Sequence, residues 1–250
     1  MPINRAPSEA DLTAVIFDGD DTLWETEELY DQCRSEAARI VQDLELDGDH
    51  FEKLQRELDV KNVARFGLSP ERFPTSSVQA YELLASAAGK PVKQEVADRI
   101  FAVSSRVFQQ RAPLYSNVEE VLEEVRVSHK LGLLTKGDHN VQTKRIDDSG
   151  LRSYFDAIRI VDEKDKTAFM AMLNELRTQP GKAWSVGNSL RSDILPALEI
   201  GMRAIWIETH VWEHERAHGY ESLSDPRLFF GERLKDIPTM LSEFNSLSPP

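Results

Sequence analysis

The sequence predicts an α/β protein with a doubly wound parallel sheet and a helical domain inserted after the first strand. Short apolar runs rich in β-branched residues alternate with segments whose apolar residues recur at helical spacing. This alternation is typical of parallel strands joined by right-handed helical crossovers. A long segment after the first apolar run contains only helical patterns, and polar clusters follow several of the runs.

Five segments have the length and composition of strands buried on both faces. They are TAVIFD (13–18), KLGLLTKG (130–137), DAIRIVD (156–162), KAWSVGNS (182–189) and RAIWIE (203–208). Helical patterns lie between them at 117–127, 138–150, 165–177 and 192–201. Gly150 and Gly201 end two of these helices, where glycine tolerates a left-handed backbone. We therefore expect a Rossmann-like core sheet with crossover helices.

Residues 26–112 depart from this alternation. No convincing strand appears there, and helix-spaced apolar residues occur throughout most of the segment. Because such an insertion is too long for a βα loop, we expect it to fold as a small helical bundle, a cap. The stretch FGLSPERFPTSS (66–77) is interpreted as a connection inside the bundle. The predicted domains are therefore a core, 1–25 with 113–250, and a cap, 26–112.

Composition limits the classes of partner. Of the 250 residues 40% are hydrophobic and 29% charged, as in globular proteins, and the net charge is −13. Without a basic block, this charge argues against nucleic acid or an anionic membrane as the main partner. The single Cys33 excludes an internal disulfide framework and suits a reducing compartment. With no apolar signal region or membrane-length run, the expected location is cytoplasmic. The oligomeric state is not determined by the sequence.

The stretch FDGDDTLW places three aspartates within four positions, from Asp18 to Asp21. Carboxylates this close raise one another's pKa unless a cation, a proton or hydrogen-bond donors compensate them. A solvated turn is the simplest interpretation, because Asp and Gly are common turn formers. A calcium-binding loop is excluded, since Leu23 and Leu29 occupy the positions that require Gly and Glu.

Polar residues also follow the later strands. Those at or just beyond the strand ends are Asp18, Thr135, Lys164, Lys166, Asn188 and Asp193. Side chains beyond the carboxyl ends of parallel strands converge on one crevice, where ligands bind. An isolated turn after the first strand does not predict this convergence. A binding or catalytic site at this edge is therefore favoured.

The segments FDGDDTLW, LLTKGD, DEKDKTAF and VGNSLRSD resemble, in order, the four motifs of the haloacid dehalogenase (HAD) superfamily of phosphohydrolases. Residues 26–112 stand where that superfamily has its helical cap of the first type, C1. The resemblance implies that Asp18 is the nucleophile and forms an aspartyl-phosphate. It implies that Asp20 protonates the leaving group and then activates water, and a spacing of two residues permits both roles. Asp21 stands where Gly is usual and is given no catalytic role.

The resemblance also implies a Mg²⁺ cofactor, which an anionic pair needs in order to accept a phosphate dianion. The implied ligands are the Asp18 side chain, the Asp20 backbone carbonyl and the motif after the fourth strand. There Asn188 replaces the usual first acidic residue while Asp193 keeps a carboxylate. We therefore expect weaker Mg²⁺ binding, and which of these two ligates directly stays open.

The predicted phosphate-binding residues are Thr135, Lys136 and Lys164. A hydroxyl can donate to a phosphoryl oxygen, and a lysine can neutralise the phosphate and keep Asp18 ionised. Lys166 is the alternative to Lys164, which lies nearer the strand end. Thr135 has a competing, purely structural interpretation, in which its hydroxyl at the strand end is hydrogen-bonded to backbone and does not bind phosphate.

The predicted function is Mg²⁺-dependent hydrolysis of a small phosphorylated metabolite whose identity the sequence does not give. A phosphomutase or phosphotransferase shares every motif and remains an alternative. A non-catalytic scaffold that binds a metabolite or partner is another alternative, but such a protein has no need of Asp20. A dehalogenase is disfavoured because that branch of the superfamily depends on neither the second aspartate nor Mg²⁺. A different class, zinc peptidase, is suggested by His214, Glu215 and His218 in an H-E-x-x-H pattern, but its surroundings are polar and Gly219 interrupts a helix there.

Overall fold

The computed structural model describes residues 13–207, 209 and 224–247. The contacts divide the chain into two compact units. The core unit combines the chain up to Glu25 with the chain from Pro113 onward, and the cap unit is Thr26–Ala112. Among the described residues, no helix is long and apolar enough to cross a membrane.

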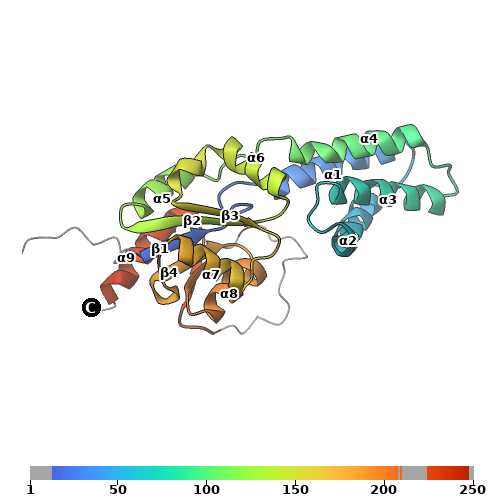
Figure 1. Cartoon of the computed structure of the whole chain (residues 1–250). Helices are drawn as coiled ribbons and strands as arrows, with labels where there is room; N and C mark the ends of the chain where they lie inside the picture. Colours follow the sequence, from blue (N-terminus) through green and yellow to red (C-terminus); the bar gives the residue numbers. More distant parts are fainter. Residues whose placement is uncertain (1–12, 208, 210–223, 248–250) are drawn as a thin grey trace, which may run out of the picture. The chain divides into compact units, whose positions relative to one another are not determined.

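The core unit contains a six-stranded parallel sheet in the order β3-β2-β1-β4-β5-β6. Figure 1 labels β1 to β4 of this sheet. Its strands are β1 (Thr13–Phe17), β2 (His129–Lys136), β3 (Ala157–Val161), β4 (Ala183–Gly187), β5 (Arg203–Ile207) and β6 (Leu228–Gly231). From β1 the chain builds outward through β2 and β3, and β4 then returns to the other side of β1. This reversal confirms the doubly wound prediction and puts the switch point of the sheet, where ligands bind in such folds, at the carboxyl ends of β1 and β4.

Helices cover both faces of the sheet (Figure 1). One face carries α5 (Val118–Val125), α6 (His139–Ser149) and α9 (Ile237–Leu247), and the other carries α7 (Lys166–Glu175) and α8 (Leu195–Glu199). Successive residues of a strand point to opposite faces. Accordingly Ala14 and Ile16 pack in one cluster with Phe169 and Met172 of α7. Burial on both faces explains why the strands are continuous apolar runs.

Local signals define the ends of several helices. The Asp138 side chain accepts hydrogen bonds from two backbone N–H groups in the first turn of α6, and Asp165 accepts one from Ala168 at the start of α7. Gly150 and Gly201 have φ angles of +77° and +92°, as predicted for left-handed helix stops. The strand β6 and the helix α9 were not predicted, because β6 is only four residues long and borders a polar region.

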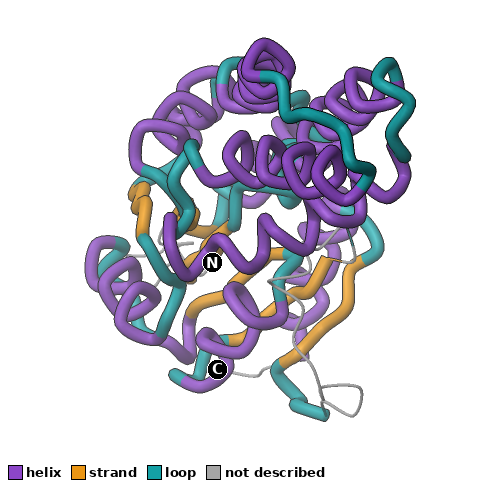
Figure 2. Tube along the Cα trace, turned by 90° about the vertical axis from the view of Figure 1, so that its right-hand side faces the viewer, coloured by secondary structure: helices purple, strands orange, loops and turns teal. Residues whose placement is uncertain are grey.

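The cap unit consists of α1 (Glu27–Gln42), α2 (Gly48–Phe66), α3 (Arg72–Ala87) and α4 (Gln94–Ser105), with a short 3₁₀ turn after α4. Helices and loops make up this unit, which contains no strand (Figure 2). Val41, Phe51, Tyr81 and Ile100, one from each helix, share its buried core. The interpretation of 66–77 as a connection is wrong for its second half, which begins α3. Pro74 is tolerated there because the first helical turn needs no backbone N–H donor.

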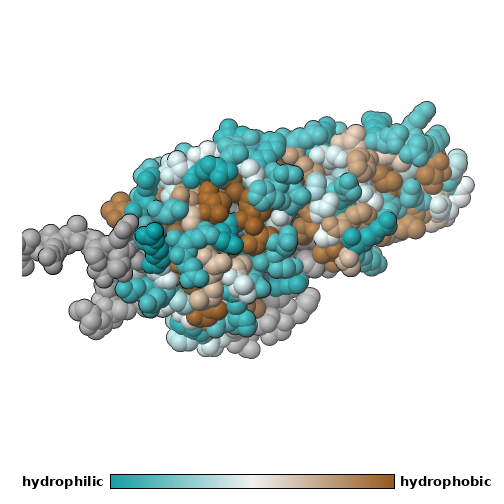
Figure 3. Space-filling model, viewed as in Figure 1, coloured by the Kyte–Doolittle hydropathy of each residue, from teal (hydrophilic) through white to brown (hydrophobic). Residues whose placement is uncertain are grey.

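The surface facing the viewer in Figure 3 is mostly hydrophilic, with smaller groups of hydrophobic residues among the polar ones. The large hydrophobic residues that are exposed in the described chain are Leu83, Val92, Phe101, Val127, Met170 and Phe230. Exposed apolar side chains of this number are ordinary for a protein of this size.

Candidate active site

The turn after β1 places Asp18 at the carboxyl edge of the sheet. The Asp18 backbone N–H donates to the Val186 carbonyl at 2.9 Å, so the strand pairing with β4 continues to this residue. The chain then turns tightly, with the N–H of Leu23 donating to the Gly19 carbonyl at 2.8 Å. A Cβ on Gly19 would lie 2.5 Å from the Trp24 ring, so this position requires glycine. Asp21 adopts φ of +57°, a left-handed conformation that Asp tolerates better than most residues.

Asp18 is buried, and both of its carboxylate oxygens have partners. Lys164 Nζ donates to Oδ1, and Thr22 Oγ1 donates to Oδ2 at 3.0 Å. Lys164 Nζ also donates to Asp193 Oδ1 at 2.7 Å, so one buried ammonium joins two carboxylates. The three side chains come from the segments that follow β1, β3 and β4, as the parallel topology predicts.

Asp18, Lys164 and Asp193 place an ammonium and two carboxyl groups away from water. This burial and the charges of the three groups shift the pKa values of Asp18 and Lys164. Burial and the Asp193 charge raise the pKa of Asp18 to about 7, with Lys164 opposing the rise. Burial by itself lowers the pKa of Lys164, but the charges of Asp18 and Asp193 outweigh it and raise that pKa above its usual value. Lys164 is therefore charged at neutral pH.

The two candidate lysines have different surroundings. Lys164 is 6% exposed and contacts Asp18. Lys166 is the first residue of α7, and its exposed ammonium pairs with Glu199 at 3.2 Å. The N-cap Asp165 between them starts the helix, so the two side chains leave the chain in different directions. The structure brings Lys164 to Asp18 and leaves Lys166 on the surface.

The segment after β4 directs Asp193 back toward the strand end. The predicted helix 192–201 is wrong at its start, because a π-helical turn, Leu190–Ile194, precedes the short α8. The N–H of Ser189, which caps this turn, donates to Asp193 Oδ2 at 2.9 Å, and Ser185 Oγ of β4 donates to the Asp193 carbonyl at 2.7 Å. A Cβ on Gly187 would lie 2.4 Å from the Asp193 carboxyl, so glycine permits this approach.

Asn188 lies beside this turn and is buried. Its backbone carbonyl accepts a hydrogen bond from Trp206 Nε1 at 2.8 Å, which joins it to β5. This hydrogen bond fixes the Asn188 backbone. The carboxylate that contacts the Asp18–Lys164 pair belongs to Asp193.

Thr135 and Lys136 end β2. Thr135 is fully buried, and its hydroxyl donates to Gln142 Oε1 at 3.1 Å instead of bonding to backbone. Lys136 Nζ donates to Ser192 Oγ at 3.1 Å and lies 3.8 Å from Glu163. Both side chains are therefore at the same sheet edge as Asp18, with protein partners of their own.

Asp20 is surrounded by residues that the sequence did not single out. Trp24 Nε1 donates to its Oδ1 at 2.6 Å, Gln142 Nε2 donates to Oδ2 at 2.8 Å, and Arg145 Nη1 donates to the same Oδ2. Gln142 and Arg145 were missed because they lie outside the conspicuous acidic clusters, and Thr22 was missed although it belongs to the FDGDDTLW segment. The one available signal was the three-residue spacing of Gln142 and Arg145, which puts them on one face of a helix.

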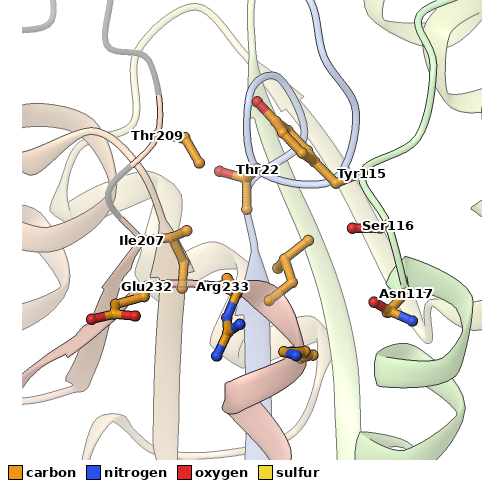
Figure 4. Close-up of a pocket in the computed structure, with 10 residues that line it drawn as sticks. Thr22, Tyr115, Ser116, Asn117, Ile207, Thr209, Glu232 and Arg233 are labelled. Carbon is orange, nitrogen blue, oxygen red and sulfur yellow. The ribbon is translucent and has the colours of Figure 1, made fainter.

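A cavity of about 310 Å³ lies in the core unit beside the turn after β1 (Figure 4). Thr22 and Tyr115 line one end of it, and Glu232 and Arg233 line the other. Thr22 is thus shared between the wall of this cavity and the hydrogen bond to Asp18. None of its described lining residues is among those predicted for catalysis, phosphate binding or Mg²⁺ binding.

The donor atoms at the sheet edge fit Mg²⁺. The Asp18 and Asp193 carboxylates converge on one ammonium, so a second cation beside them would meet oxygen ligands. In the described part of the chain, no group of three or more His, Cys, Asp or Glu residues could hold a metal. Two carboxylates still suffice for Mg²⁺, which usually keeps waters and takes substrate phosphate oxygens. His214, Glu215 and His218 of the zinc pattern lie outside the described residues.

The fold and this site define a doubly wound α/β protein with a helical insertion after its first strand and a lysine between two carboxylates at the carboxyl edge of its sheet. The family model for haloacid dehalogenase-like hydrolases matches residues 15–207, and the chain belongs to this family. The resemblance noted from the four sequence motifs is thereby confirmed.

Individual relatives are more distant. N-acylneuraminate-9-phosphatase from Homo sapiens is 28% identical over 208 residues, which cover 78% of this chain and 82% of the relative. Glyceraldehyde 3-phosphate phosphatase from Methanopyrus kandleri is 26% identical over 240 residues, which cover 93% of this chain and 99% of the relative. Among solved structures, a haloacid dehalogenase-like family hydrolase from Xanthomonas campestris superimposes with a TM-score of 0.76 at 25% identity. The superposition covers 94% of this chain and 97% of that structure.

Proposed function

We propose that this protein is a Mg²⁺-dependent phosphohydrolase that acts on a small phosphate ester through an aspartyl-phosphate at Asp18. The observation that supports this most directly is the buried Asp18 carboxylate, which contacts Lys164 and Thr22 and is followed two residues later by Asp20. A nucleophile flanked by a cation, with a second carboxylate available for proton transfer, is what phosphoryl transfer in two steps requires.

In the first step, an Asp18 oxygen attacks phosphorus and the ester P–O bond breaks. The proton of Asp20 passes to the leaving oxygen, which departs as an alcohol. In the second step, Asp20 accepts a proton from water as the water oxygen attacks phosphorus. The bond between Asp18 and phosphorus then breaks, and inorganic phosphate is released.

Lys164 supplies the positive charge in both steps. Its ammonium lies on the Asp18 carboxylate and favours the ionised, nucleophilic form. The same charge is placed to neutralise the transferred phosphoryl group. Thr135 and Lys136, at the end of β2, are the further candidates for binding phosphoryl oxygens, after exchanging their present protein partners for substrate.

Asp18, the Asp20 carbonyl and Asp193, with Asn188 beside them, are the proposed ligand set for Mg²⁺. When bound, this cation shields the carboxylates from the phosphate dianion and stabilises the charge of the transferred group. Because Asn188 replaces a carboxylate in the motif, the affinity for Mg²⁺ is proposed to be lower than two acidic residues there would give.

The relatives support the choice of substrate class. Two of them are phosphatases named for small phosphorylated sugars. We therefore propose a small phosphorylated metabolite as substrate, with sugar phosphates as the first candidates. The protein's own net charge of −13 makes local cations such as Lys164 necessary for binding such an anion.

The test is a screen of purified protein against sugar phosphates, nucleotides and phosphoglycolate-like acids, with release of inorganic phosphate as the measurement. We expect release with Mg²⁺ present, and none from Asp18→Asn or after chelation. A phosphomutase would instead convert a substrate into a phosphorylated isomer without releasing phosphate. Failure to release phosphate from any ester would refute the proposal.

A further inference from the structure

We propose that Gln142 and Arg145 of α6 are positioning residues that orient Asp20 for proton transfer, and that Asp20 Oδ1 is the oxygen that exchanges the proton. This inference depends on the proposed function, because it concerns the acid–base step at Asp20. Neither residue lies in the acidic motifs, and both reach Asp20 from more than 100 positions away in the sequence.

The hydrogen bonds of the Asp20 carboxylate are unequally distributed. Oδ2 accepts from two donors, Gln142 Nε2 at 2.8 Å and Arg145 Nη1, whereas Oδ1 accepts only from Trp24 Nε1 among the described residues. A carboxylate offers about four acceptor positions, two on each oxygen. Both positions on Oδ2 are therefore occupied, and one on Oδ1 is left for a leaving-group oxygen or a water molecule.

Gln142 is itself held in one orientation. It is 2% exposed, its Oε1 accepts from Thr135 Oγ1 at 3.1 Å, and its Nε2 also donates to the Lys136 carbonyl at 3.2 Å. A Cβ on Gly137 would lie 3.0 Å from Nε2, so the glycine at this turn leaves room for the amide. The amide thus connects the end of β2 to Asp20 with its donor side directed at Oδ2.

Arg145 reaches the same oxygen from one turn further along α6. Its side chain is 8% exposed, compared with 26% for Asp20, so the guanidinium is mostly removed from water. A buried cation is costly without a hydrogen-bonded partner, so the Arg145–Asp20 pair resists separation. Together, Gln142 and Arg145 restrict rotation of a side chain that is otherwise partly open to solvent.

Orientation matters here because Asp20 must serve two proton transfers from one position. Displacement of a reacting group by about 1 Å can reduce the rate roughly 100-fold. If Gln142 and Arg145 only joined α6 to the turn after β1, their loss would lower stability without changing how the rate depends on the leaving group. That dependence separates a positioning role from a merely structural one.

The experiment compares wild type with Gln142→Met, Arg145→Met and Arg145→Lys on a series of phosphate monoesters with Mg²⁺ present. The esters range from p-nitrophenyl phosphate, whose leaving group needs little protonation, to alkyl phosphates. Lys144→Met is the matched control, because Lys144 is on the same helix but pairs at the surface with Asp148. Thermal unfolding of each variant verifies that it is folded.

For both Met variants, we expect the rate on alkyl phosphates to fall by about 10- to 100-fold, a fraction of what a general acid contributes. Bond cleavage in p-nitrophenyl phosphate should be nearly unchanged, while phosphoenzyme accumulates because the second step needs the base. Arg145→Lys should restore part of the lost rate, and Lys144→Met should behave as wild type.

An equal loss on all esters without accumulation of phosphoenzyme would overturn the positioning role, as would unchanged rates in Gln142→Met and Arg145→Met. These results leave the proposed function intact as long as wild type hydrolyses esters and Asp18→Asn does not. If wild type hydrolyses no ester, the proposed function itself is refuted, and this inference with it.

Discussion

The Asp18→Asn substitution should abolish hydrolysis and, in metal-free buffer at pH 8, make the fold more stable. Removing the proposed nucleophile leaves only binding and positioning terms, so activity should fall by several orders of magnitude. The stability effect follows from the raised pKa of Asp18. An ionised Asp18 opposes folding because it is buried beside Asp193 and shares a single ammonium with it. Asparagine has nearly the same shape without the charge.

The size of the effect follows from linkage. The pKa of Asp18 is about 7 in the folded protein against a reference value of 3.8. Each unit of difference corresponds to about 1.4 kcal/mol, so the upper limit of the gain at pH 8 is about 4 kcal/mol. Because the folded pKa is the higher one, Asp18 favours folding at low pH and this contribution is lost as the pH rises through 7. At pH 5 the gain from asparagine should therefore be smaller, about 1 to 2 kcal/mol.

The assay is urea or thermal unfolding at pH 5 and pH 8 in the presence of a chelator. For a chain of this length, a gain of 1 kcal/mol corresponds to a Tm increase of about 2 to 4 °C. Lys164→Met is the control of opposite sign, because it leaves two buried carboxylates without a cation and should destabilise by about 3 to 5 kcal/mol. An Asp18→Asn protein less stable than wild type at pH 8, or equally stabilised at both pH values, would refute this reasoning.

Three further predictions concern single residues of the site. Asp20→Asn should slow breakdown of the aspartyl-phosphate more than its formation from an aryl phosphate, since a good leaving group needs little protonation. Rapid-quench trapping of phosphoenzyme measures the two steps, and equal slowing of both would contradict the prediction. Gly187→Ala should displace the Asp193 carboxyl and lower kcat roughly 100-fold, whereas Gly181→Ala, where a Cβ meets no atom within 4 Å, should have no effect. Asn188→Asp should lower the Mg²⁺ concentration needed for half-maximal activity, because it adds a charged ligand candidate; an unchanged requirement would place this side chain outside the influence of the metal.

The sequence alone determined the alternation of strands and helices and the positions at which the main strands end. These features follow from local physical chemistry: apolar runs specify strands buried on both faces, and aspartate or glycine at helix ends satisfies the backbone locally. Parallel topology then requires the strand-end residues to share one edge, so the neighbourhood of Asp18 was predictable without coordinates. The strand β6 was not predicted because a segment of four residues is too short to show a periodic pattern.

Only the tertiary structure decided which side chains touch. The sequence favours Lys164 over Lys166 only because it lies nearer the strand end, whereas its burial between Asp18 and Asp193 distinguishes the two in the structure. Gln142 and Arg145 have no unusual local pattern, yet α6 brings both to Asp20. Contacts of this kind depend on how a helix packs on the sheet and on the rotamers that the packing leaves available, and neither is specified by the residues adjacent in the chain.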